Sequence, residues 1–539
     1  MIPSAYADTF ARDHLPPAAE WPDLIFELPD YRYPDRLNCV TELLDRRLAT
    51  GSDRPCLITA TEILTYGALA ERVNRIANVL VRDLGLESGL RVLLRSANNP
   101  QFVAAYLAVM KAGGIAVATM PLLRARELGY PIAKAEISLS LCDFRLAEEM
   151  EKAKALAPAL KRIVYFNSPE DDGLEALMRK ASPDFEAFDT AADDVCLIGF
   201  TSGTTGEPKG TMHFHRDVLL IADGYGKHVL EANETDRFIG SPPLAFTFGL
   251  GGLVVFPMRV GAASILLEKA APDDLIAAID RHGATVTFTA PTAYRAMLSK
   301  LEPGSCRSLR KCVSAGETLP KAVFDAWLDA TGIRLMDGIG ATEMLHIFIG
   351  APEEKIRPGA TGLPVPGYYA KIVDGEGSEV PRGTPGRLAV KGPTGCRYLD
   401  DPRQHNYVEK GWNITGDTFI EDEDGYFWYQ ARSDDMIVSA GYNISGIEIE
   451  NALLTHPAIA ECAVIGVADE ERGMVPKAFI VLRSGHAGDA QMVKTLQDHV
   501  KAEIAPYKYP RRVEFRDALP KTQTGKLQRF ALRAEEAKK

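Results

Sequence analysis

The sequence predicts an α/β protein with largely parallel sheets, because helix-like segments and short buried strands alternate along residues 57–280. The segment Asn99–Lys111 places apolar residues at helical spacing, and Ile115–Ala118 then forms a short apolar run. The same succession of a helix-like segment and a short apolar run recurs at Leu275–Ile279 and Val286–Thr289. Strands that alternate with helices in this way are typical of parallel sheets covered by helices.

Two further changes of pattern divide the rest of the chain. Between Gly359 and Gly416, short strand-like pieces such as Ala370–Val373 are separated by Gly/Pro turns, which predicts a small β-rich unit. Beyond Arg432 the pattern indicates a compact α+β unit. Its expected elements are the helices Gly446–Leu454 and Ala490–Ile504 and the strands Cys462–Val467 and Lys477–Leu482. Because a chain of 539 residues is long for one hydrophobic core, at least two domains are expected.

Composition and charge exclude some classes of partner. Hydrophobic residues make up 46% and charged residues 25% of the chain, as in ordinary globular proteins. The net charge of -12 argues against a nucleic-acid or anionic-membrane binder, since both usually need a basic surface. Residues 1–20 lack the apolar stretch of a signal peptide, so a cytoplasmic protein is expected. The apolar window Leu250–Leu267 is broken by Pro257 and Arg259, and it predicts two buried strands joined by a turn rather than a membrane span.

The eight cysteines are scattered along the chain. They show no C-x-x-C spacing, and no histidine cluster accompanies them in the sequence. Reduced thiols are therefore expected, and a zinc site is not.

The segment with the most groups suited to ligand binding is the glycine loop Thr201–Gly210, which follows the expected strand Val195–Phe200. Glycines let backbone N–H groups turn toward an anion, hydroxyls add donors, and a lysine adds a compact positive charge suited to a polyphosphate. The candidate phosphate-binding residues are Thr201, Ser202, Gly203, Thr204, Thr205 and Lys209. The loop is not of the G-x-x-x-x-G-K-[ST] type, because Gly210 stands where a hydroxyl would follow the lysine. Taken alone, it also fits a Gly/Thr-rich hairpin with a solvated lysine.

Four further segments carry polar groups among small residues. They are Ser314-Ala315-Gly316-Glu317, Asp337-Gly338-Ile339-Gly340-Ala341-Thr342-Glu343, Thr415-Gly416-Asp417 and the run from Pro520 to Lys526. Thr342 offers a hydroxyl, and Glu343 offers a hard oxygen suited to Mg²⁺. Asp417 offers a carboxylate that accepts hydrogen bonds from ribose hydroxyls, and Lys526 ends a Gly/Thr-rich loop. Each segment alone fits a plain turn or a solvated lysine.

In this order and spacing, the motifs resemble those of the acyl-adenylate-forming superfamily, which includes acyl-CoA synthetases, luciferases and peptide-synthetase adenylation domains. The resemblance covers residues 38–529, and it includes the pairs Arg432-x-Asp434 and G-x-T-E at 340–343. It implies a large N-terminal domain, residues 1–433, made of two α/β sheets plus a distorted β-barrel. It also implies a small mobile α+β C-terminal domain, residues 434–539, that carries the catalytic lysine and swings about a hinge at Asp434.

The resemblance implies a reaction in two steps. In the first, a carboxylate attacks the α-phosphate of ATP and pyrophosphate leaves. Lys526 and Thr342 would contact the reacting groups, Glu343 would hold Mg²⁺, and the glycine loop would hold the leaving phosphates. The remaining residues implied for the AMP site are Ser314, Ala315, Gly316, Glu317, Asp337, Gly338, Ile339 and Gly340 beside adenine, with Asp417 and Arg432 at ribose.

In the second implied step, the thiol of CoA attacks the acyl-adenylate and AMP leaves. Ser439, Gly441 and Tyr442 would line a tunnel for the pantetheine arm, since glycine lets a narrow chain pass close to the backbone. Many members of the superfamily carry Tyr at the position of Ile339 and Gly at that of Ala431. Neither departure removes a reacting group. A separate carrier protein in place of CoA stays open as the acceptor, and the enzyme is expected to be a monomer or a homodimer.

The pocket for the acid is implied by the same resemblance. Its walls would be Phe246, Thr247, Phe248, Ala315, Gly340, His346 and Ile347. Aromatic walls and a flat Gly/Ala floor suit a planar ring, and the runs around Phe246, His346 and Tyr398 look like those of benzoate- and 2-aminobenzoate-CoA ligases. His346 fits either a hydrogen bond to an ortho substituent or a plain wall residue, and Phe246–Phe248 also fit the core of a strand. A medium-chain fatty acyl-CoA synthetase is the other alternative.

Overall fold

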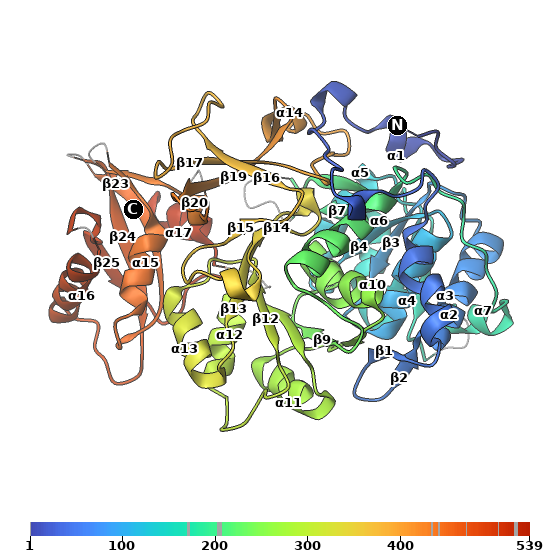
Figure 1. Cartoon of the computed structure of the whole chain (residues 1–539), viewed down its shortest axis with the longest axis horizontal. Coiled ribbons are helices and arrows are strands. Elements are labelled where there is room, and N and C mark those ends of the chain that lie inside the picture. The colour runs from blue at the N-terminus through green and yellow to red at the C-terminus, as the bar shows by residue number, and fades with distance from the viewer. Residues whose placement is uncertain are drawn as a thin grey trace.

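The protein is a mixed α/β structure with a large N-terminal part and a separate C-terminal part, as the sequence predicts. The computed structural model describes residues 2–169, 173–201, 207–432, 435–439, 442–469, 472–504, 506–521 and 527–539. Figure 1 shows the blue and cyan N-terminal elements at one end of the molecule and the orange and red C-terminal elements at the other. The boundary predicted between residues 433 and 434 lies outside the described residues.

The largest sheet has nine strands, and its centre is parallel. Its order is β15 (Leu363–Pro364), β14 (Ile347–Gly350), β13 (Leu335–Gly340), β12 (Lys311–Ala315), β11 (Val286–Thr289), β9 (Arg237–Gly240), β10 (Ala263–Ile265), β1 (Pro55–Ile58) and β2 (Ile63–Thr65). The outer strands β2, β14 and β15 pair antiparallel. Because β12 and β13 are parallel neighbours, their carboxyl ends lie side by side, which brings residues 314–316 and 337–340 together.

A second sheet has six strands and is parallel except for its last pair. Its order is β6 (Arg162–Phe166), β5 (Leu139–Asp143), β3 (Arg91–Arg95), β4 (Ile115–Thr119), β7 (Val195–Phe200) and β8 (Gly210–Phe214). The antiparallel pair β7–β8 places Thr201 and Lys209, the described ends of the glycine loop, at one end of this sheet. This position is the one that the sequence predicts.

Helices cover these two sheets. The longer ones are α3 (Tyr66–Asn78), α4 (Pro100–Lys111), α5 (Ala125–Lys134), α6 (Ala147–Leu156), α11 (Pro272–His282), α12 (Pro291–Leu298) and α13 (Lys321–Thr331). The side chain of Asn99 caps α4 by accepting a hydrogen bond from the N–H of Phe102, and Pro100 occupies the first turn, where a missing N–H costs nothing. Every residue of α4 is buried, so this helix forms the centre of the large apolar core.

The prediction for the window Leu250–Leu267 is half wrong. Its first part is helical, as a π-helix (Gly251–Val255) followed by α10 (Phe256–Val260), and only β10 is a strand. An apolar run that is buried on all sides has no clear period, so it does not distinguish a buried helix from a buried strand. Among the described residues, no helix combines the length and the apolarity that crossing a membrane requires.

A third, antiparallel sheet follows the two α/β sheets and corresponds to the predicted β-rich unit. Its strands are β16 (Tyr369–Val373), β17 (Gly386–Lys391), β19 (Trp412–Glu421), β18 (Val408–Glu409) and β20 (Phe427–Arg432). The predicted tight turn at Thr415–Asp417 is instead an irregular point inside β19, where Gly416 has a φ of +74°. A positive φ of this size favours glycine.

The C-terminal part has its own sheet and its own apolar cores. The strands are β22 (Tyr442–Ile444), β21 (Ile437–Ser439), β24 (Gly473–Leu482), β23 (Ile459–Asp469) and β25 (Arg512–Phe515), with helices α15 (Gly446–Leu454), α16 (Ala490–Glu503) and α17 (Arg529–Glu536). The predicted helices at 446–454 and 490–504 and both predicted strands are confirmed. Separate cores are what two domains require.

The structure brings together two cysteines and a histidine that the sequence leaves far apart. Ligand-type atoms of Cys39, Cys196 and His215 lie within 4.8 Å of one another, and all three residues are buried. His215 Nδ1 lies 3.2 Å from the Sγ of Cys39, and its Nε2 lies 3.2 Å from the hydroxyl of Tyr6. These contacts fasten the N-terminal segment to β7 and α8 (His215–Ile221). These three residues are far apart in the sequence, so no spacing pattern indicates that they meet.

Candidate active site

Thr201 and Lys209 stand at the two ends of the glycine loop and form its neck, where hydrogen bonds join them. The N–H of Thr201 donates to the carbonyl of Lys209 at 2.9 Å, and the N–H of Lys209 donates to the hydroxyl of Thr201 at 3.2 Å. These bonds extend the β7–β8 pairing by one residue on each strand. The predicted loop residues Ser202, Gly203, Thr204 and Thr205 lie outside the described residues. Thr201 and Lys209 are thus held at the end of the sheet, where their side chains can meet those of other elements.

Lys209 meets Glu343 through the phenol of Tyr398. The Nζ of Lys209 donates to the Tyr398 hydroxyl at 2.6 Å and lies 3.5 Å from Oε1 of Glu343. The Tyr398 hydroxyl donates to the same carboxylate oxygen at 2.5 Å. Glu343 is 7% exposed and Tyr398 is fully buried. The structure therefore brings together two predicted site residues that are far apart in the sequence, and it adds a third.

Glu343 lies in a one-turn 3₁₀-helix, Thr342–Met344, that directly follows β13. The turn ends at Leu345, which has a φ of +69°. The carbonyl of Thr342 lies 2.8 Å from Nε2 of His213, so β8 supports the turn from behind. Gly199 on β7 allows a close approach here, because a Cβ at that position would lie 3.0 Å from the Thr342 methyl group. Thr342 and Glu343 are thereby placed beside the neck of the glycine loop.

A buried ion pair supports this region. The guanidinium of Arg397 donates to the carboxylate of Asp217, and neither side chain is exposed to solvent. Arg397 also lies over the ring of Phe214, 4.0 Å from its centroid, and Asp217 lies 3.8 Å from His213. Burial alone would raise the pKa of Asp217, but the charge of Arg397 together with His213 holds that pKa below its ordinary value.

The residues predicted beside adenine lie at the adjacent ends of β12 and β13. Ser314 pairs in register with Asp337, and Ala315 pairs with Gly338. The strand β12 continues through Ala315, so the predicted turn begins only at Gly316, which has a φ of +87°. Glu317 follows this turn, and its Oε2 accepts hydrogen bonds from the N–H and the hydroxyl of Thr292.

Asp337 has an unusual environment for a carboxyl group. Burial raises the pKa of Asp337 to about 8, although the N–H of Gly338 opposes the shift. The segment from Asp337 to Gly340 is part of β13 rather than a turn, and Ile339 is half-buried there. A Cβ at Gly340 would lie 2.9 Å from the backbone of His346, so only glycine fits at this close approach.

The two residues predicted to contact ribose have neighbouring backbones. Asp417 on β19 and Arg432 on β20 are register partners. Asp417 is 8% exposed, and its N–H donates to the hydroxyl of Thr415 at 3.3 Å. The side chain of Arg432 lies outside the described atoms.

The predicted acid pocket contains a histidine inside a box of aromatic rings. The ring centroid of His346 lies 4.6 Å from that of Phe256, 5.7 Å from those of Tyr225 and Phe248, and 6.3 Å from that of Phe288. His346 is 2% exposed, and no group in the described part of the chain meets a ring nitrogen at full hydrogen-bond geometry, although the backbone of Phe248 lies near enough to act on the pKa of the ring. Burial lowers the pKa of His346 to about 3, despite the opposing influence of the Phe248 backbone, so the ring is neutral at neutral pH.

The structure corrects the prediction for one group of the other wall residues. Phe246 precedes the short helix α9 (Thr247–Leu250), so Thr247 and Phe248 are helical and the strand interpretation of Phe246–Phe248 is wrong. Ala315 is 4% and Ile347 is 3% exposed. The helix approaches His346 closely because position 251 is glycine, where a Cβ would lie only 2.3 Å from Cδ2 of the imidazole. The aromatic neighbours Tyr225, Phe256 and Phe288 were not predicted, because no local motif marks them.

The C-terminal part contributes fewer described site residues. Lys526, Asp434 and Gly441 lie outside the described residues. Ser439 is 3% exposed on β21, and its backbone pairs in register with that of Tyr442. Glu461 on β23 lies 3.4 Å from Arg295 of α12 and 2.7 Å from Lys521. One carboxylate therefore links the large N-terminal part to the residue that precedes the segment 522–526.

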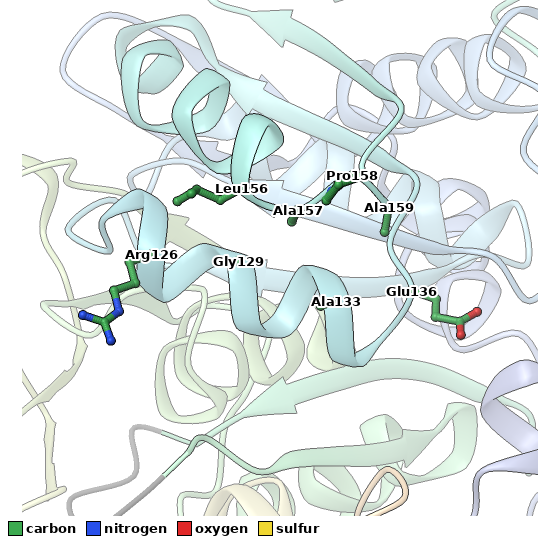
Figure 2. Close-up of a pocket in the computed structure, with 8 residues that line it drawn as sticks. All are labelled: Arg126, Gly129, Ala133, Glu136, Leu156, Ala157, Pro158 and Ala159. Atoms are coloured by element: carbon green, nitrogen blue, oxygen red, sulfur yellow. The ribbon is translucent and has the colours of Figure 1, made fainter.

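A shallow hollow of about 760 Å³ lies elsewhere on the surface, between α5 and the end of α6. Figure 2 shows Arg126 and Glu136 at its opposite ends, with small apolar residues such as Ala157 and Pro158 between them. None of the predicted site residues lines it. The hollow does not belong to the candidate active site.

Comparisons with known proteins assign nearly the whole chain to one family of enzymes. Residues 44–397 match the model of the AMP-binding enzyme family, and residues 448–526 match that of the AMP-binding enzyme C-terminal domain. A benzoate–CoA ligase of Thauera aromatica is 36% identical over 94% of this chain and 97% of its own length. The crystal structure of an anthranilate CoA ligase in complex with anthranoyl-AMP covers 95% of this chain and 99% of its own, with a TM-score of 0.89 and 35% identity. The crystal structure of a benzoate CoA ligase from Burkholderia xenovorans LB400 covers 92% of this chain and 100% of its own, with a TM-score of 0.84 and 33% identity.

Proposed function

The chain belongs to the AMP-binding enzyme family and is an AMP-forming acid–thiol ligase, and from this premise we propose that it joins an aromatic carboxylic acid to coenzyme A. The aryl acid is activated as an aryl-adenylate, with release of pyrophosphate. The thiol of coenzyme A then takes the aryl group and releases AMP. We place the enzyme in the cytoplasm and its domain boundary between residues 433 and 434.

The observation that carries the choice of acid is the aromatic box around His346. Its walls are planar rings, and a planar ring that enters such a box gains offset or edge contacts with them. The named substrates of the similar proteins, benzoate and anthranilate, are planar aromatic acids of this kind. A flexible aliphatic chain would leave the ring faces poorly matched.

Within the aromatic acids, we favour 2-aminobenzoate. His346 is neutral and buried, and within the described residues its ring nitrogens have no hydrogen-bond partner. A buried polar group without a partner costs about 1–3 kcal/mol, so a ligand that supplies the partner gains affinity. An ortho amino group can donate to an imidazole nitrogen, whereas benzoate offers no such group.

At the other end of the site, the charged residues suit a nucleoside triphosphate with a divalent cation. Glu343 offers a hard carboxylate oxygen beside the hydroxyl of Thr342, which is the donor type that Mg²⁺ prefers, and both lie at the neck of the glycine loop. Mg²⁺ bound there would neutralise phosphate charge and orient the triphosphate. Lys209 would hold the leaving phosphates, and Lys526 would stabilise the charge that develops between the carboxylate and the α-phosphate. Ser314, Gly316, Asp337 and Asp417 would hold the nucleoside.

A substrate panel tests this function. Pyrophosphate release is measured with benzoate, 2-aminobenzoate, hydroxybenzoates, heteroaryl acids and short and medium-chain fatty acids, each with and without coenzyme A. We expect the highest kcat/KM with a benzoate-type acid and full turnover only when coenzyme A is present. A preference for octanoate over every aryl acid, or turnover that does not respond to coenzyme A, would contradict the proposal.

A further inference from the structure

We propose that Tyr398 is a positioning residue for the adenylation step: its phenol bridges the ammonium of Lys209 and the carboxylate of Glu343 and keeps them from closing into a direct hydrogen-bonded pair, so that both can receive a nucleoside triphosphate and its divalent cation. The inference rests on the proposed function, because it takes Lys209 and Glu343 as the groups that receive the phosphates and the cation. It assigns a role to a residue that belongs to neither of the two glycine-rich motifs.

The directions of the two hydrogen bonds follow from their chemistry. A lysine ammonium only donates and a carboxylate only accepts, so the phenol accepts from Lys209 at 2.6 Å and donates to Glu343 at 2.5 Å. A phenol with its ordinary pKa of about 10 carries its proton at neutral pH. The phenol therefore keeps its proton, and that proton stays available to the carboxylate.

The polypeptide around Tyr398 leaves the phenol little freedom. The N–H of Tyr398 donates to Oε1 of Gln404 at 2.9 Å, and its ring makes an edge contact with the ring of Tyr407 at 5.8 Å between centroids. The N–H of Leu399 donates to the carbonyl of Gly210, the residue that follows Lys209, at 2.8 Å. The segment 397–399 is thereby joined to β8 like an added strand, with Thr211 and Tyr398 as bridge partners.

The same segment is also fastened to the turn that carries Glu343. The hydroxyl of Thr394 donates to the carbonyl of Met344 at 2.8 Å and is itself 2.7 Å from the hydroxyl of Tyr368. The stretch from Thr394 to Leu399 thus contacts both elements whose side chains Tyr398 joins. A phenol anchored to both sides fixes the distance between them.

Removal of the hydroxyl would change what Lys209 and Glu343 do before the nucleotide arrives. Their Nζ and Oε1 atoms already form a long ion pair at 3.5 Å, and without the phenol between them they would close into a direct hydrogen-bonded ion pair. In a largely buried place such a pair is strong, and the nucleotide and its cation would have to break it. The phenol prevents this closure and leaves each charge only partly compensated.

The test is Tyr398→Phe, which keeps the ring and removes the hydroxyl. The matched control is Tyr66→Phe, whose equally buried hydroxyl donates to the carbonyl of Ala262 at 2.7 Å, far from Lys209 and Glu343. Calorimetry measures the Kd of ATP with Mg²⁺ and with EDTA, so that a readout besides activity is available. We expect Tyr398→Phe to weaken ATP binding about tenfold in Mg²⁺ and to reduce the ratio of the two Kd values toward one.

Two further measurements separate positioning from simple damage. Conversion of pre-made aryl-adenylate to the thioester uses neither the leaving phosphates nor the cation, so it should stay within about twofold of wild type in Tyr398→Phe. In a Glu343→Gln background, Tyr398→Phe should cost little more in ATP affinity, because residues that act as a unit are not additive. This cycle also covers the case in which Tyr398→Phe folds poorly, since Glu343→Gln alone should then remove the same dependence on Mg²⁺.

Several outcomes would overturn the inference. They are an unchanged Mg²⁺ dependence of ATP binding in Tyr398→Phe, equal losses in both half-reactions, or fully additive losses with Glu343→Gln. A wild-type enzyme that forms no aryl-CoA from any acid would instead contradict the proposed function, so the two failures are distinguishable.

Discussion

The two ends of the candidate site are built in opposite ways. At the phosphate end, Lys209, Tyr398 and Glu343 satisfy one another, and the buried pair of Arg397 and Asp217 supports them. At the acid end, His346 lies among aromatic rings, and its nitrogens have no partner within the described residues. Under the proposed function, a ligand at the first end would exchange partners with the protein, whereas an ortho-substituted acid at the second end would supply a partner that the imidazole lacks.

The largest effect expected is that of Lys526→Ala on chemistry at the phosphate end. Loss of one group that stabilises developing charge reduces a rate by about 10²–10³-fold. We expect this loss in the pyrophosphate-releasing step, measured with saturating 2-aminobenzoate. Conversion of pre-made aryl-adenylate to the thioester should continue, and a parallel loss of that second step would contradict the role given to Lys526.

The supporting ion pair gives an effect of comparable size, which is on stability. Arg397→Met keeps much of the side-chain volume but leaves the carboxylate of Asp217 buried without its cation, which costs about 3–5 kcal/mol. Urea unfolding should show this loss in the free energy of unfolding. The double change Arg397→Met with Asp217→Leu is the control, and it should recover most of the loss. A loss below about 1 kcal/mol for Arg397→Met would mean that the phosphate end does not depend on this pair.

The acid end predicts a pH dependence of stability. The pKa of His346 is about 3 in the folded protein, below its ordinary value of about 6.5, so between these values the unfolded chain binds more protons. Stability should then fall as the pH falls below 6.5, by about 1.4 kcal/mol per pH unit from this residue. Urea unfolding at pH 7 and pH 5 should show a smaller fall, by about 2 kcal/mol, in His346→Leu than in wild type. The same fall in both proteins would contradict a neutral buried imidazole.

The smallest effect expected is the one on selectivity at the acid end. If an ortho amino group supplies the partner that His346 lacks, His346→Ala should lower kcat/KM for 2-aminobenzoate about tenfold more than for benzoate. Steady-state kinetics with both acids on both proteins measure this difference. Equal losses on the two acids would make His346 a plain wall residue.

Much of the framework could be predicted from the sequence because its signals are local. The strand Val195–Phe200 and the helix 446–454 are confirmed with the predicted bounds, since apolar runs and helical spacing are read within a few turns of chain. The run 251–260 was misread as strand, because a fully buried helix has no polar face to reveal its period.

The parts of the site that escaped prediction depend on contacts between distant segments. Tyr398 is 189 residues from Lys209 and 55 from Glu343, and Tyr225 reaches His346 from the helical segment Ala222–Gly226. No spacing rule links such residues; only the order of strands in the sheets brings them together. The predicted roles of Thr342, Glu343, Asp417 and Lys526 remain predictions, and the experiments above address those of Glu343 and Lys526.

The most direct test of the central claim follows one oxygen atom through the reaction. The enzyme is incubated with ATP, Mg²⁺, coenzyme A and 2-aminobenzoate whose carboxylate carries ¹⁸O, and the products are analysed by mass spectrometry. If the carboxylate attacks the α-phosphate and the thiol then displaces AMP, one ¹⁸O atom appears in AMP and the other stays in the aryl-CoA thioester. Label in inorganic phosphate with formation of ADP, or AMP without label, would contradict the account.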